Sequence, residues 1–224
     1  MDEKSHPFSA AVRSIAGLYD GLVREHGDNA HAAQQRDRAT QEQRMRMLAQ
    51  VGDIRHAKIL DFGCATGHLL TFLRREFDFE GEYVGYDLSK EMVKLAREKF
   101  PEARFEQRDV LAEGIDEQFD FVFVSGTFNN RLPDNWSLVT ALLTPLFACT
   151  RQALAFNGLS TYVDFFDEGL YYFQPEKIFG FCKSQLSPLV TLRHDYCVKP
   201  GVVPYEFTIY VHQTDIEPRA SKTP

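Results

Sequence analysis

The chain has few cysteines and a shortage of basic residues. Its 224 residues include four cysteines, and 25 Lys and Arg stand against 32 Asp and Glu, a formal net charge of -7 at pH 7. The cysteines form no C-x-x-C pair, so neither a zinc ribbon nor a disulfide framework is indicated. Because a protein that follows nucleic-acid phosphates needs clustered Lys and Arg, we expect no nucleic-acid partner. A small-molecule or carrier-bound substrate is expected instead.

Long apolar runs are also missing. No run approaches the roughly 20 residues that span a bilayer. The N-terminus MDEKSHPFSA does not have the cationic and then apolar layout of a signal peptide. We therefore expect no membrane partner and a cytoplasmic location. With 44% hydrophobic residues, a chain of this length suffices for one compact domain and a short accessory segment.

Residues 1–55 show helical periodicity. Apolar residues share a helix face in two stretches, Val12, Ile15, Ala16, Tyr19 and Leu22 in the first and Met45, Leu48 and Ala49 in the second. The polar stretch HGDNAHAAQQRDRA separates them. The pattern predicts two helices with a mobile joint, which form either a lid over a site or a plain extension that covers a sheet edge.

From Lys58 the pattern changes to short apolar runs that alternate with amphipathic stretches. The predicted strands are 58–62, 82–87, 103–109, 119–125, 153–160 and two near 189–197 and 205–212, and the predicted helices are 67–77, 89–100, 135–151 and 175 to about 186. This alternation predicts an α/β domain over residues 56–213, with a mostly parallel sheet and helices on both faces. The connection CVKPGVVPYE is too short for a crossover helix, so the last two strands are expected to be antiparallel. Residues 214–224 form a polar tail.

The segment ILDFGCATGHLL, residues 59–70, has the clearest chemical meaning. A strand ends at Asp61, and Gly63, Ala65 and Gly67 then make a tight turn that opens a helix. Small residues let the backbone approach a bound ligand closely, and the start of a helix favours negative charge. The turn therefore predicts a nucleotide-like ligand at the carboxyl edge of the sheet.

Two later acids support this interpretation by their spacing. Asp87 ends the second predicted strand twenty residues after Gly67, where a carboxylate accepts hydrogen bonds from ribose hydroxyls. Asp109 ends the third predicted strand and is placed to meet an adenine amino group. Acids at the ends of three successive strands are much less expected by chance than one acid at the end of one strand.

A dinucleotide such as NAD is the competing ligand. Its fingerprint requires glycine at the first, third and sixth positions of the turn. Counting from Gly63, the third position is Ala65 and the sixth is His68. A side chain as large as that of His68 disfavours NAD.

Over roughly residues 55–213 the sequence resembles the class I S-adenosylmethionine (SAM)-dependent methyltransferases. The first motif of that family matches DFGCATG at 61–67, the ribose and adenine positions match Asp87-Leu88 and Asp109-Val110, and FDFVFVSG at 119–126 resembles the fourth-strand motif. Tyr19-Asp20 resembles a pair often found in the helix that covers the cofactor. The resemblance implies SAM as cofactor and a Rossmann-like seven-stranded sheet with an antiparallel last strand. The cofactor-binding residues that it implies are Tyr19, Asp61, Gly63, Cys64, Ala65, Gly67, Asp87, Leu88, Asp109, Val110 and Ser125.

The acceptor side is expected in the loop SGTFNNRLPDNW and in the aromatic stretch TYVDFFDEGLYYF. Asn129 and Asn130 offer amide groups where the methyl group would face, or they serve the turn before the next helix. Tyr172 is a candidate wall of a pocket for a sulfonium, or it packs over the sheet edge. His194 is a candidate base, although a lone histidine in an edge strand is commonly structural. His194 and Cys197 lack further ligands, so no metal site is expected.

The predicted activity is methyl transfer by in-line displacement, with positioning of the acceptor as the main catalytic effect. A base is required only for a hydroxyl acceptor. Two alternatives remain open at this point: an enzyme that cyclises or cleaves SAM and releases methylthioadenosine, and a SAM-binding partner without catalysis. No oligomeric state is implied.

Overall fold

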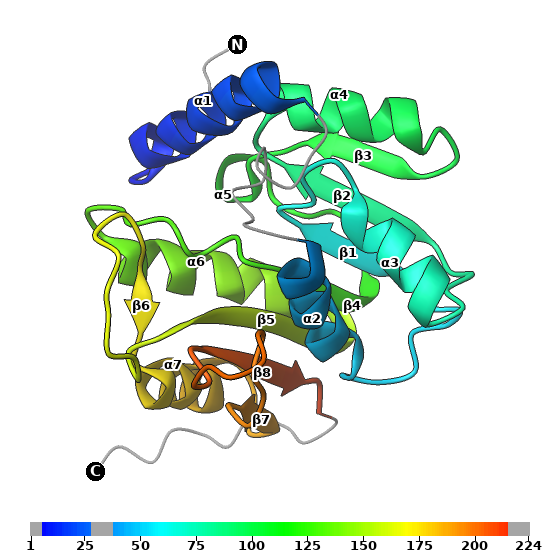
Figure 1. The fold of residues 1–224 in the computed structure, drawn as a ribbon. Coiled ribbons are helices and arrows are strands. Elements are labelled where there is room, and N and C mark those ends of the chain that lie inside the picture. Colours follow the sequence, from blue (N-terminus) through cyan, green and yellow to red (C-terminus); the bar gives the residue numbers. More distant parts are fainter. Residues whose placement is uncertain (1–5, 28–37, 215–224) are drawn as a thin grey trace.

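The computed structural model describes residues 6–27 and 38–214 (Figure 1). Most of the predicted joint between the first two helices, and the tail from residue 215, lie outside the described residues. Within the described ranges, no helix is both long enough and apolar enough to cross a membrane.

One mixed sheet runs through the protein. Its strands are β1 (Ile59–Phe62), β2 (Tyr83–Asp87), β3 (Arg104–Gln107), β4 (Phe119–Val124), β5 (Thr150–Ser160), β6 (Tyr172–Phe173), β7 (Val190–Arg193) and β8 (Glu206–His212). The order is β3-β2-β1-β4-β5-β8-β7, and β6 pairs with the end of β5 off this path. Strand β8 is antiparallel to both β5 and β7. The predicted seven-strand Rossmann-like order with an antiparallel last strand is confirmed, and the short β6 is an addition to it.

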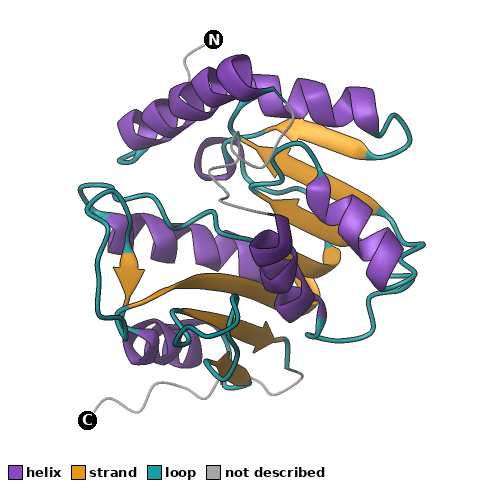
Figure 2. Ribbon diagram, in the orientation of Figure 1, coloured by secondary structure: helices purple, strands orange, loops and turns teal. Residues whose placement is uncertain are grey.

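Helices cover both faces of the sheet (Figure 2). On one face lie α2 (Arg38–Ala49), α3 (His68–Glu76) and α4 (Lys90–Lys99), and on the other α5 (Val110–Glu113), α6 (Asn135–Ala148) and α7 (Pro175–Phe181). Strand β4 shows why two cores form. Phe121 and Phe123 pack toward the first group of helices, and Val122 and Val124 pack toward the second. Because side chains alternate along a strand, a fully apolar strand serves both cores.

Two helix caps lie near the site, one as predicted and one at a residue that was assigned to a strand. Ser89 caps α4 as predicted, and its Oγ accepts a hydrogen bond from the Met92 backbone N at 3.1 Å. Strand β3, however, ends at Gln107, and Asp109 caps α5 instead of ending the strand. Its carboxylate accepts from the Leu111 backbone N at 3.1 Å, which is the hydrogen bond of an N-cap residue.

The two N-terminal helices contact different parts of the domain. Helix α1 (Ser9–His26) packs along α4, as Figure 1 shows at the top of the view. Val23 and Tyr19 of α1 contact Met92 of α4. Helix α2 packs on α3 and on the sheet through Met45 and Leu48. The two predicted helices of residues 1–55 are therefore present, and both border the carboxyl edge of the parallel strands.

Candidate active site

A cavity that opens to solvent lies at the carboxyl edge of the parallel strands. Its walls are the turn after β1, the ends of β2 and β3, the loop after β4 and the inward faces of α1, α2 and α6. Ligands of open α/β sheets bind at this edge, outside the carboxyl ends of the strands. The cavity therefore lies where a nucleotide-like ligand is expected.

The turn between β1 and α3 is the floor of the cavity. Gly63, Ala65 and Gly67 have φ of 80°, 47° and 79°, the left-handed region that glycine adopts most readily. A Cβ on Gly63 would lie 2.3 Å from Oγ1 of Thr127 in the loop after β4, so this contact requires glycine. Cys64 in the same turn is buried, and burial raises the pKa of its thiol. The residues of the turn, from Gly63 to Thr66, line the cavity.

Asp61 lies at the end of β1 and is 2% exposed. The Tyr83 hydroxyl donates to its Oδ2, whereas its Oδ1 is buried without a hydrogen-bond partner among the described residues. Burial raises the pKa of Asp61 to about 7, and the charge of Asp87 adds to this shift. An unpaired buried carboxylate oxygen costs about 1–3 kcal/mol or more, so its presence in a cavity wall indicates a site for a cationic or hydrogen-bond-donating group.

Asp87 connects the glycine turn to the next strand. Its Oδ2 accepts from the Ala65 backbone N at 2.9 Å, and its Oδ1 accepts from the Ser89 backbone N at 2.8 Å. Burial raises the pKa of Asp87, and these hydrogen bonds oppose the shift. A carboxylate has about four acceptor positions, so the predicted ribose contacts remain compatible with both backbone contacts. Leu88 beside it also borders the cavity.

Asp109 and Val110 form the wall beyond Asp87. Besides capping α5, Asp109 places Oδ2 at 2.9 Å from Nε2 of His6. Val110 is buried and borders the cavity. This contact of His6 was not predictable, because a residue ahead of the first helix has no local pattern that connects it to an acid 103 positions later.

The loop after β4 joins the site to α1. Ser125 and Asn130 border the cavity, and Asn130 Nδ2 donates to the Tyr19 hydroxyl at 3.0 Å. Burial raises the pKa of Tyr19, so this group is a phenol at neutral pH. The contact holds the covering helix against the loop at the point where an acceptor is expected.

The two predicted acceptor-side asparagines have different environments. Asn130 borders the cavity, whereas Asn129 is not among the residues that line it. The Oδ1 of Asn129 is buried and has no partner in the described part of the chain. In the turn before α6, Asp134 caps the helix, and Asn135 Nδ2 donates to the Asn130 backbone carbonyl at 2.7 Å.

Tyr172 and His194 are not among the residues that line the cavity. The Tyr172 hydroxyl accepts from the Asp167 backbone N at 3.1 Å, and its ring meets Phe166 edge to face. Nε2 of His194 lies 3.0 Å from the Pro204 carbonyl oxygen. The catalytic roles predicted for these two residues remain predictions, and the fold gives each a structural partner.

Helix α2 and the start of α3 contribute to the site, which the sequence did not predict. Arg38, Gln41 and Met45 of α2 and His68 of α3 line the cavity. Positions 38, 41 and 45 share one face of a helix, so their common direction was available from the sequence. That this face meets the glycine turn was not, because it depends on how α2 packs.

Comparisons with known proteins agree with this geometry. The family model described as a methyltransferase domain matches residues 59–145. Rv1506c of Mycobacterium tuberculosis, whose name places it among the methyltransferases, is 37% identical over 161 residues, which cover 69% of this chain and 92% of that protein.

The fold is similar to solved methyltransferase structures. Magnesium protoporphyrin IX methyltransferase from Synechocystis, with bound SAM, has a TM-score of 0.64 at 12% identity and covers 94% of this chain and 100% of its own. The 1,6-didemethyltoxoflavin-N1-methyltransferase of Burkholderia thailandensis has a TM-score of 0.63 at 18% identity. The match covers 94% of this chain and 93% of that protein's chain.

A parallel sheet with a glycine turn and three acids at its carboxyl edge defines a nucleotide-binding α/β enzyme. The chain belongs to the class I SAM-dependent methyltransferases, and SAM is its cofactor.

Proposed function

We propose that this methyltransferase acts on a small-molecule or carrier-bound acceptor that occupies the cavity between α1 and α6, beside SAM. The observation that supports it most is the composition of that part of the wall. Its side chains are mainly apolar and come from both helices and from the loop after β4: Val12, Ile15, Phe128, Leu132, Leu138 and Leu142. Such a wall favours an acceptor with a substantial apolar surface, oriented by a few polar groups.

The residues on the other side of the cavity suit the cofactor. SAM, when bound, supplies a methyl group on a positively charged sulfur. In our proposal Asp61 binds the ammonium group of its methionine part, Asp87 binds the ribose and Asp109 with Val110 borders the adenine. The unpaired Oδ1 of Asp61 supports this placement, because a buried acceptor without a donor is stabilised by a cationic ligand.

In this reaction the protein orients the acceptor relative to the methyl group. The Asn130 contact to Tyr19 holds α1 over the cavity, which excludes water and limits how an acceptor lies. Because Tyr19 has a raised pKa, it serves as a hydrogen-bond donor rather than as a base. An acceptor whose nucleophilic atom needs no deprotonation, such as a carboxylate or a neutral amine, suits this arrangement.

Product analysis tests the proposal against the two alternatives. The purified protein is incubated with SAM alone and with candidate acceptors, and nucleosides are identified by mass spectrometry. We expect S-adenosylhomocysteine (SAH), the product left after methyl loss, only when an acceptor is added. Methylthioadenosine formed without acceptor would instead support the cyclase or lyase. Tight SAM binding with no product from any acceptor would support the non-catalytic partner.

A further inference from the structure

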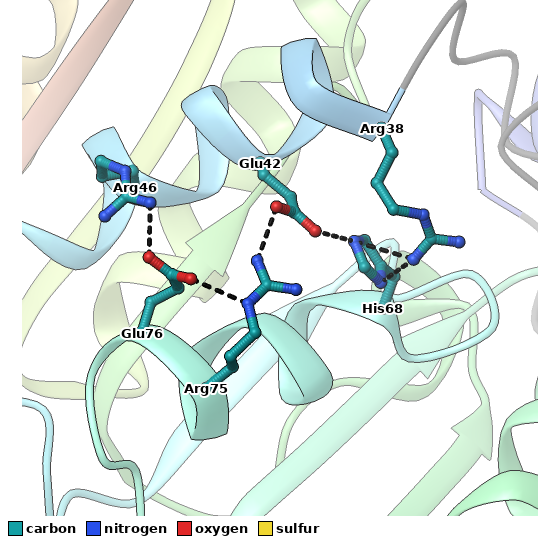
Figure 3. Close-up of polar contacts among 6 residues, drawn as sticks. All are labelled: Arg38, Glu42, Arg46, His68, Arg75 and Glu76. Atoms are coloured by element: carbon teal, nitrogen blue, oxygen red, sulfur yellow. Dashed lines mark hydrogen bonds and ion pairs between the residues drawn. The ribbon is translucent and has the colours of Figure 1, made fainter.

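Helix α2 meets α3 through a ladder of charged side chains (Figure 3). Arg38, Glu42 and Arg46 recur every fourth residue and therefore project from one side of α2. The contacts join them to α3 in series: Arg38 Nη1 to His68 Nδ1 at 2.6 Å, Glu42 Oε1 to His68 Nε2 at 3.1 Å, Glu42 Oε2 to Arg75 Nη2 at 2.6 Å, Glu76 Oε1 to Arg75 Nε at 2.8 Å and Glu76 Oε2 to Arg46 Nη2 at 2.6 Å.

The two ends of this ladder lie in different surroundings. Arg38 and His68 border the cavity, whereas Arg46 and Glu76 are not among its lining residues. His68 is the first residue of α3, directly after the glycine turn. An arginine is thus held at the start of a helix and beside the turn that faces the cofactor.

The contacts of His68 fit a neutral ring. Arg38 Nη1 lies 2.6 Å from Nδ1 and 3.1 Å from Nε2, and Glu42 Oε1 lies 3.1 Å from Nε2. In the neutral ring with its proton on Nε2, Nε2–H donates to Glu42 and Nδ1 accepts from Arg38. Burial lowers the pKa of His68, and the positive charge of Arg38 lowers it further, which agrees with a neutral ring. Burial alone would raise the pKa of Glu42, but its contacts with Arg75 and His68 outweigh this and lower it, so Glu42 is ionised. Glu42 therefore orients His68, and His68 orients Arg38.

Asp61 lies on the other side of the same turn. Its buried and unpaired Oδ1 favours a cationic ligand group, whereas Arg38 and the N-terminus of α3 favour an anionic one. A ligand with both charges in one small unit, such as the α-amino acid end of SAM, complements this pair of opposite charges.

We propose that Arg38, oriented by His68 and Glu42, binds the carboxylate of the amino-acid end of the cofactor, and that the bound cofactor thereby holds α2 on α3. The inference rests on the proposed placement of the ammonium group at Asp61. It gives α2 a part in cofactor recognition that depends on the carboxylate and on no other group of the ligand.

Calorimetric titration with two ligands isolates this contact. The ligands are SAH and its decarboxylated analogue, which keeps the adenosine, the thioether and the amine. For the wild type we expect SAH to bind at least about tenfold more tightly than the analogue. In Arg38→Gln, SAH affinity should fall by about ten- to one-hundredfold while the analogue binds as before. Arg46→Gln is the matched control: it removes an ion pair from the same ladder, and the preference for SAH should persist.

The positioning roles are tested with the same two ligands. Glu42→Gln should reduce the preference for SAH over the analogue, because His68 loses the charge that orients it. Arg75→Gln leaves the contact between Glu42 and His68 in place and should preserve the preference.

Two results would overturn the inference. If Arg38→Gln weakened SAH and the analogue by the same factor, Arg38 would act only in docking α2. If SAH affinity were unchanged in this variant, the carboxylate would bind elsewhere. A wild type that binds neither ligand would contradict the proposed placement of the cofactor itself, a result distinct from both.

Discussion

The Tyr83 hydroxyl donates to one oxygen of Asp61 and leaves the other oxygen of the same buried carboxylate without a described partner. The arrangement lies at the end of β1, next to the glycine turn. Leaving a buried acceptor unpaired destabilises the ligand-free protein. The ligand, in our proposal, supplies the missing donor, so stability is lost in the empty site and regained on binding.

Replacing Asp61 by Asn should stabilise the ligand-free protein at alkaline pH. Burial raises the pKa of Asp61 from about 3.8 to about 7, so the folded state binds its proton more tightly than the unfolded chain does. The stability of the wild type therefore falls as pH rises from about 4 to 7, and the full cost of ionisation is present above pH 7. In thermal denaturation, the melting temperature of Asp61→Asn should exceed that of the wild type at about pH 8.5, and this difference should disappear toward about pH 4. A difference in melting temperature that does not depend on pH would show that ionisation of Asp61 does not cause it.

Asp87→Ala should weaken SAM binding by about 1.5–3 kcal/mol, the range for hydrogen bonds to a charged group. The structure adds a second expected effect, a lower melting temperature, because Asp87 also accepts from the backbones of Ala65 and Ser89. Calorimetric titration well below the melting temperature separates the two effects. A folded variant with unchanged affinity would contradict the assignment of Asp87 to the ribose.

Residues 8–26 and 38–49 should gain protection from hydrogen exchange when SAH binds. Three contacts join these helices to the domain: Tyr19 to Asn130 at 3.0 Å, Ser89 Oγ to Asp20 at 2.6 Å, and Arg38 to His68. A ligand that fills the space beneath them stabilises the closed arrangement. Amides of the buried strand β4 serve as the internal reference. Equal protection with and without SAH would show that the helices are a static extension of the sheet.

Tyr19→Phe and Tyr172→Phe should differ in their effect on turnover. Tyr19 borders the cavity and accepts from Asn130, so loss of its hydroxyl frees the loop that orients the acceptor. We expect kcat to fall by about tenfold with SAH affinity nearly unchanged, as for the loss of about one hydrogen bond. The Tyr172 hydroxyl accepts from the Asp167 backbone instead, so Tyr172→Phe should keep its turnover. A fall in turnover in Tyr172→Phe alone would return the acceptor site to the aromatic stretch.

The elements that depend on neighbouring residues were predictable. The apolar strands β1 and β4 and the Ser89 cap of α4 appear where the sequence placed them, because burial of a strand and capping of a helix depend on residues a few positions apart. The end of β3 was wrong by two residues, because Asp109 was assigned to the strand and caps α5 instead. The short β6 was missed, since its two residues pair with the distant end of β5 and have no periodicity of their own.

The sequence by itself determined the class of fold, the glycine turn and the gathering of the acids at one edge of the sheet, because parallel strands bring their carboxyl ends to one edge whatever the details of packing. Only the tertiary structure decided which side chains from elsewhere complete the site. His6 reaches Asp109, Asn130 reaches Tyr19, and Arg38 reaches His68, each across at least 30 positions of chain. Such contacts follow from the docking of α1 and α2 on the domain, which depends on the summed burial of whole helix faces and not on any local pattern.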